Sequence, residues 1–80
     1  MRPTQHPTNT RVLGAPAGWD QGELPCSAIA ITDSQENGVH CVTSFWRPTA
    51  EELAALQAGH FLALTIVGTT MPPAQMWVAE

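Results

Sequence analysis

The chain has 80 residues, of which 44% are hydrophobic and only 12% are charged, whereas a typical domain has about 25% charged residues. Its net charge is −4 and it has three arginines and no lysine, which excludes general binding to DNA or RNA, because that needs clustered Lys and Arg. No apolar run reaches the roughly 18 residues of a membrane helix, so we expect no membrane partner, and the length predicts one domain with a marginally stable core.

The N-terminus and the cysteines predict a cytoplasmic location. The first ten residues contain no apolar stretch, so we expect no secretion signal. Cys26 and Cys41 are the only cysteines. In a chain without an export signal they are expected to be free thiols in a reducing cytoplasm.

Proline and glycine are dense in residues 1–25, which forbids a long helix or a central strand there. We expect residues 1–10 to be a flexible tail and residues 11–80 to be the domain. Within it, residues 11–25 are predicted as an arm laid over the rest, with a short edge strand RVL at 11–13 and Trp19 as the anchor. A disordered arm is the alternative, although Trp and Leu are unusual in disordered segments.

Two β-rich segments follow the arm. CSAIAIT at 26–32 and VHCVTSFW at 39–46 are β-branched or alternating, which predicts strands, and the DSQENG between them is a turn cluster. The two strands are expected to form a hairpin in which Ile31 lies opposite His40.

A capped helix follows. Thr49 has Glu52 three residues later, the spacing of a capping box in which each side chain bonds the other residue's backbone amide. AEELAALQA continues with strong helix formers, and Gly59 supplies the left-handed residue after the helix. Leu53 and Leu56 share one face.

HFLALTIV at 60–67 and AQMWVA at 74–79 are predicted as the last two strands. The resulting order is β-β-α-β-β. A helix between two strands implies a parallel pair, so we expect an α+β fold: a mixed four-stranded sheet with one helix on one face.

Small apolar side chains gather on the other face of this predicted sheet, because successive residues of a strand point to opposite faces. No second helix is available to cover them, so either the arm with Trp19 or another subunit must do so. We expect a homo-oligomer, since a bare apolar face of this size is unusual. The predicted interface residues are Ala28, Ala30, Cys41, Thr43, Ala63 and Thr65.

The start of the helix could also bind an anion, but the capping box uses two amide donors there and the adjacent glutamates repel an anion, so we interpret it as mainly structural. A strand end just before it still allows a ligand to be stacked and charge-paired. The loop GTTMPP at 68–73 is either a stiff connection or one wall of a cleft. The predicted ligand-binding residues are Trp46, Arg47, Trp19, Thr69 and Thr70.

We expect no metal site, no cofactor and no catalytic residues. His40 and Cys41 are adjacent in a strand and point to opposite faces, and no CxxC or HxxxH spacing exists. A disulfide is disfavoured, because the predicted register places Cys26 opposite Phe45 and Cys41 opposite Ala30. A nucleophile elbow, a glycine-rich phosphate loop and suitably spaced paired carboxylates are also missing.

Several stretches together resemble a group of small hypothetical proteins from tailed phages and prophages of proteobacteria: LGAPAGWD at 13–20, a cysteine shortly after it, SFWRPTAEELAALQAG at 44–59 and LTIVGTTMPP at 64–73. The resemblance covers residues 13–78. In that group a histidine often precedes the two prolines, where this chain has Met71. The group has no established function, so no catalytic residue carries over.

The resemblance implies a phage accessory protein in the cytoplasm of the bacterial host. Three functions remain open. The first is a non-catalytic counter-defence protein that binds a small anionic or nucleotide-like ligand at homo-oligomer interfaces, which Arg and Trp near loop ends favour. The second is a protein–protein inhibitor that covers a host protein, and the third is a virion or assembly accessory.

Overall fold

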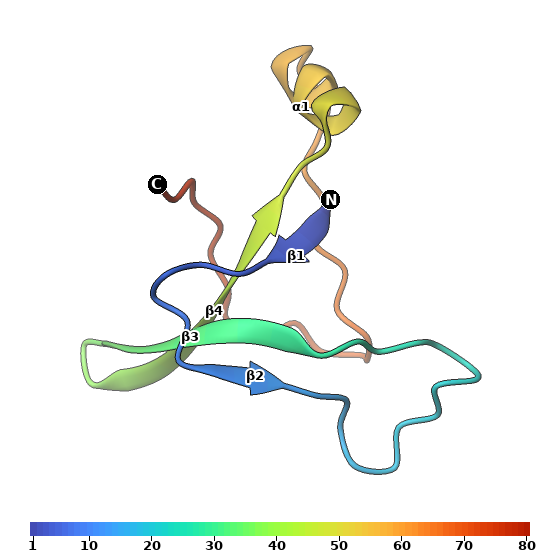
Figure 1. Cartoon of the computed structure of the whole chain (residues 1–80), viewed down its shortest axis with the longest axis vertical. Helices are drawn as coiled ribbons and strands as arrows, with labels where there is room; N and C mark the ends of the chain where they lie inside the picture. Colours follow the sequence, from blue (N-terminus) through green and yellow to red (C-terminus); the bar gives the residue numbers. More distant parts are fainter. The chain divides into compact units, whose positions relative to one another are not determined.

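The computed structural model describes all 80 residues. The chain divides into two units, Met1–Pro48 and Thr49–Glu80, and each is described by itself. The first unit contains a four-stranded antiparallel sheet, and the second contains one helix (Figure 1). The chain is therefore of the α+β class, as the sequence predicts.

A hairpin forms the centre of the sheet. Its strands are β3 (Ile29–Glu36) and β4 (Val39–Arg47), and they are joined by Asn37 and Gly38. Both turn residues have positive φ, 53° and 82°, which is the backbone that a tight two-residue hairpin turn requires. The predicted hairpin is confirmed, although its turn is shorter and its strands continue closer to the turn.

The register of the hairpin differs from the prediction. Ile31 lies opposite Ser44 rather than His40, and His40 lies opposite Gln35. The reason is the length of the turn: DSQENG as a whole is expected to form it, whereas only the last two residues, Asn37 and Gly38, do so. Because the shift from His40 to Ser44 is an even number of residues, each side chain keeps its predicted face.

Two short strands complete the sheet at opposite edges. β1 (Arg2–Thr4) pairs with the end of β4, and β2 (Arg11–Leu13) pairs with the start of β3, which gives the order β1-β4-β3-β2 (Figure 1). β2 is the predicted RVL strand. β1 departs from the expected flexible tail; its Pro3 is tolerated because proline fits an edge strand, which needs fewer amide donors.

Residues 5–10 cross from one edge of the hairpin to the other and lie on the face that carries Phe45 and Thr32. The ring of His6 stacks on Phe45, with centroids 3.9 Å apart and 9° between the planes. The hydroxyls of Thr8 and Thr32 are 3.0 Å apart, and Asn9 Nδ2 donates to Thr32 Oγ1 at 3.3 Å. Part of the face that we expected to be bare is therefore covered by the N-terminal residues themselves.

The arm closes mainly on itself. Trp19 Nε1 donates to the carbonyl of Leu24 at 2.6 Å. Gln21 and Cys26 exchange two bonds, with Gln21 Nε2 donating to the Cys26 carbonyl at 2.9 Å and Cys26 N donating to Gln21 Oε1 at 2.7 Å. The side chain of Trp19 thus anchors a loop between β2 and β3, and the expected arm laid over the sheet is not confirmed.

Very little apolar surface is buried. Ile31 is the one buried hydrophobic residue, with 3% of its surface exposed, and its partners across the sheet are Arg11 and Ser44. Burying one such side chain contributes about 1.5–3 kcal/mol, which is small beside the entropy of ordering a chain of this length. The sheet depends largely on backbone pairing and polar side-chain bonds.

In the second unit, helix α1 (Ala50–Gln57) begins and ends as predicted. Thr49 Oγ1 accepts from the amide of Glu52 at 3.1 Å, and the Glu52 carboxylate accepts from the amide of Thr49 at 2.9 Å. After the helix, Gly59 has a φ of 93°. The capping box and the left-handed glycine are confirmed.

Residues 60–80 form neither helix nor strand, so the strands expected at 60–67 and 74–79, the β-β-α-β-β order and the mixed sheet are not confirmed. An alternating segment becomes a strand only where a neighbouring strand pairs with its backbone. Here the outer edge of β4 is paired only at its last three residues, by β1, and HFLALTIV pairs with no strand. No helix is long and apolar enough to cross a membrane.

Candidate functional site

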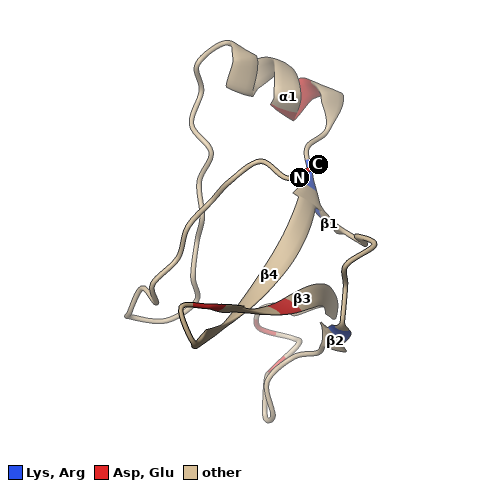
Figure 2. Ribbon diagram, turned by 90° about the vertical axis from the view of Figure 1, so that its left-hand side faces the viewer, with Lys and Arg blue, Asp and Glu red and all other residues tan.

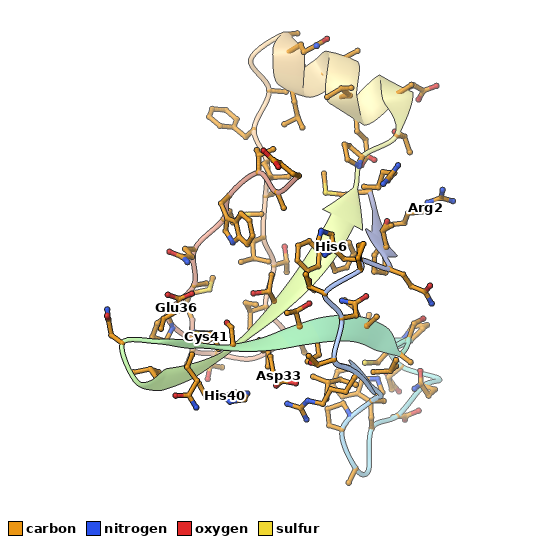
Figure 3. All side chains as sticks on the ribbon, turned by 60° about the vertical axis from the view of Figure 1, so that its left-hand side comes forward. Arg2, His6, Asp33, Glu36, His40 and Cys41 are labelled. Carbon is orange, nitrogen blue, oxygen red and sulfur yellow. The ribbon has the colours of Figure 1, made fainter.

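A polar cluster on the sheet is centred on Asp33 and includes Thr10, Arg11 and His40; we call it the Asp33 cluster. Arg11 donates from Nε to Oδ2 at 2.9 Å and from Nη2 to Oδ1 at 2.9 Å. Thr10 Oγ1 donates to Oδ2 at 2.6 Å, and His40 Nε2 lies 2.8 Å from Oδ1. Figure 2 shows the basic residue of β2 beside an acidic residue of β3, and Figure 3 shows Asp33 and His40 on one side of the hairpin.

The electrostatics of this cluster keep the carboxylate ionised. The hydrogen bonds from Arg11 and then from Thr10 hold the pKa of Asp33 well below its usual range. The hydrogen bond between Arg11 and Asp33 also raises the pKa of Arg11. Because both carboxylate oxygens already accept two bonds, Asp33 is poorly suited to act as a general base. The cluster instead ties β2, β3 and β4 together.

This cluster was not predicted, because the predicted turn DSQENG includes Asp33. The available signal was the position of Asp33, two residues beyond Ile31 and therefore on the same strand face. Cys41, which follows His40 in the sequence, lies opposite Ser34 on the other face of the hairpin. The structure does not bring the two together on one face.

A second charged feature is the pair of Arg2 and Arg47, which we call the arginine pair. The two residues are partners in the β1–β4 ladder, and Figure 2 shows basic residues where these strands meet. Both are exposed, and neither takes part in the ion pairs of Asp33. Arg2 was missed because residues 1–10 were expected to be a tail.

The predicted ligand residues are distributed over both units. Trp46 is 49% exposed and its Nε1 donates to Ser44 Oγ at 2.8 Å. Alternation along β4 points Trp46 and Arg47 to opposite faces. Trp19 belongs to the loop before β3, and Thr69 and Thr70 are exposed residues of the second unit.

The predicted interface residues also fall into two groups. On the first unit, Ala30, Cys41 and Thr43 are half-buried, and Ala28 is exposed. Ala30 borders an open hollow of about 310 Å³ that is otherwise lined by residues 5–6 and 9–12, so the chain itself partly shields this position. The remaining two, Ala63 and Thr65, are exposed in the second unit.

The largest apolar exposure lies in residues 60–78, which we call the apolar segment. Phe61 is 97% exposed and Val78 is 99% exposed. Other large hydrophobic side chains that remain exposed here are Leu62, Leu64, Ile66, Val67, Met71, Met76 and Trp77. Exposed apolar surface on this scale is typical of a surface that contacts another macromolecule.

No three His, Cys, Asp or Glu side chains are grouped so as to hold a metal ion, and both cysteines are free thiols. Comparison with protein-family models, with curated proteins and with solved structures found no match.

Proposed function

We propose that this chain is a non-catalytic accessory protein of phage type that works in the bacterial cytoplasm as a homo-oligomer. The observation that carries the proposal is the contrast between one buried hydrophobic residue, Ile31, and an apolar segment whose large side chains are exposed. Association with a second copy would bury these side chains and add the stability that so short a chain lacks.

The sheet supports association through a strand of a second copy. β1 pairs only with residues 45–47 of β4, so residues 39–44 have a free outer edge. HFLALTIV at 60–67 alternates and has no strand partner. Strand addition would satisfy the backbone groups of both, and the low charge of the chain would not oppose it.

The Asp33 cluster argues against catalysis. Its carboxylate is occupied by Arg11, Thr10 and His40, and the cysteine of β4 faces the other side. A role in counter-defence, with a small nucleotide-like ligand, agrees with the phage resemblance and with the exposed arginines.

The exposed apolar segment favours one alternative, in which the chain is a protein–protein inhibitor that covers a host protein. The two functions predict different behaviour of the isolated chain. A homo-oligomer associates alone, whereas an inhibitor stays monomeric until its target is present.

Light scattering coupled to size-exclusion chromatography tests the proposal. At micromolar concentration we expect a mass that is a multiple of 8.6 kDa. Ala63→Arg should reduce it to one chain, because a guanidinium within a dry interface is costly to desolvate. Gln57→Arg, on an exposed helix residue, adds the same charge and should leave the mass unchanged.

A wild-type mass near that of one chain would overturn the homo-oligomer. We prefer Ala63 to Ala30 as the test position, because Ala30 borders the hollow beneath the chain's own N-terminal residues. Ala30→Glu would disturb the monomer as well as any interface.

A further inference from the structure

Arg2 and Arg47 are placed directly opposite each other in an antiparallel ladder. Cα atoms of such partners are on the order of 5 Å apart, and their side chains leave the same face of the sheet. Like charges in directly opposite positions destabilise a strand pair. The chain nevertheless carries this pair in an overall acidic protein of net charge −4.

The third arginine, Arg11, differs from Arg2 and Arg47 because its charge is neutralised. Arg11 is neutralised by a two-point contact with Asp33, in a cluster that ties strands together. Neither Arg2 nor Arg47 takes part in that cluster, and both residues are exposed. Two guanidinium groups on one face are therefore left facing solvent.

We propose that the arginine pair binds the phosphate groups of a nucleotide. An oxyanion with several oxygens accepts hydrogen bonds from two guanidiniums at once, because their planar donor groups match phosphate geometry. Its negative charge also removes the repulsion between the two arginines. The ligand would thus stabilise the β1–β4 pairing as well as occupy the site.

An aromatic pair next to the arginines selects a nucleotide over free phosphate. Phe45 precedes Arg47 by two residues, so it faces the same side, about 7 Å along the strand. His6 is stacked on Phe45, with ring centroids 3.9 Å apart. Stacking on aromatic side chains is a common way to hold a base. This site deepens the ligand-binding part of the proposed function and does not require self-association.

Isothermal titration calorimetry with pyrophosphate and with ADP tests the site at low ionic strength. We expect both probes to bind the wild-type chain, with ADP binding more tightly. Arg2→Gln and Arg47→Gln should each weaken both probes about tenfold or more, since each removes a hydrogen bond between charged groups. His6→Ala should weaken ADP but leave pyrophosphate unchanged.

Gln57→Glu is the matched control, because it changes the net charge by the same single unit and lies outside β1 and β4. The arginine variants should melt no lower than the wild type, because each relieves the repulsion between Arg2 and Arg47.

The site would be overturned if neither probe bound, or if the control weakened binding as much as Arg2→Gln. Equal binding of the two probes would remove the nucleotide and leave a phosphate site. The mass measured by light scattering is independent of all these results, so failure here is distinguishable from failure of the homo-oligomer.

Discussion

At the scale of single residues, the contacts of Thr49 show whether the N-terminus of the helix is available to bind an anion or is capped by the chain itself. Its hydroxyl and the Glu52 carboxylate bond each other's backbone amides. Those amides are the donors that an anion at the helix start would use. The capping box is therefore structural, and the charged function proposed for this region belongs to Arg47 and its neighbour across the ladder.

Thr49→Ala should lower the free energy of unfolding by about 1 kcal/mol, because the amide of Glu52 loses its acceptor. Thr49→Ser keeps the hydroxyl and should lower the free energy of unfolding by only a few tenths of that amount. Urea unfolding followed by circular dichroism measures both changes. A loss of ADP binding in Thr49→Ala at unchanged stability would contradict the structural interpretation.

The lowered pKa of Asp33 predicts how the free energy of unfolding depends on pH. Arg11 lowers the pKa of Asp33 in the folded chain below its ordinary value of 3.8. A carboxyl with a depressed folded pKa stabilises the fold fully above its unfolded pKa, and this contribution is lost as the pH falls below about 4 and through the folded pKa. The wild type should lose more stability between pH 7 and pH 3 than Asp33→Asn does.

Urea unfolding at several pH values and one protein concentration measures this difference. Glu36→Gln serves as the control, because Glu36 is an exposed acidic residue of the same strand outside the Asp33 cluster. Its acid dependence should match that of the wild type. Parallel acid curves for the wild type and Asp33→Asn would show that the cluster contributes nothing to stability.

At the scale of elements, the hairpin turn sets the register of the whole sheet. Asn37 tolerates its positive φ because asparagine enters the left-handed region more readily than most residues. Gly38 has a φ of 82° and open space where a Cβ would lie. Any cost of a side chain there must come from the backbone conformation rather than from a clash.

Gly38→Ala should therefore destabilise the chain by about 1 kcal/mol. Gly14→Ala is a clean control, since Gly14 also has open space around it and no positive φ; that variant should be neutral or slightly stabilising. Thermal unfolding of the two variants, compared at one concentration, measures the difference. Equal melting temperatures would show that the turn does not hold the register.

The elements that the sequence predicts correctly are those specified by neighbouring residues. Thr49 and Glu52 define the helix start, because the motif spans only a few positions, and the turn lies within the predicted cluster DSQENG, although only Asn37 and Gly38 form it. β1 could not be predicted, because it depends on which distant strand the N-terminal residues join, and the Asp33 cluster was missed because the predicted turn was too long and included Asp33. HFLALTIV shows the reverse case: its alternation is a strand pattern, but whether it pairs depends on a partner that local sequence does not specify.

The residues of the candidate site also divide into those that neighbouring sequence identifies and those that depend on distant strand pairing. Arg47 was proposed from its place at a strand end, and Trp46, which was proposed with it, points to the opposite face. Arg2 and His6 were not, since proline-rich residues at a terminus give no pairing signal. Only the ladder between Arg2 and Arg47 shows that two charges meet.

At the scale of the whole molecule, the balance of burial governs behaviour. A chain with 44% hydrophobic residues and one buried hydrophobic side chain leaves much of its apolar surface in water. The exposed side chains lie mostly in the apolar segment, and the charges lie mostly outside it. Such a division suits a protein that buries its apolar segment by associating with another chain. The proposed phosphate site belongs to the other unit, Met1–Pro48.

The crossing of residues 5–10 over the hairpin has a consequence for the order of folding. β3 and β4 are joined by a two-residue turn, so they can pair early, whereas β1 must find residues at the far end of β4 and close a long loop. β1 should form last and open first. In hydrogen exchange we expect the amides between β1 and β4 to exchange fastest in the sheet, and equal protection of β1 and β3 would contradict this order. Because β1 is only three residues long, an incoming strand that exchanged with it would have little structure to displace.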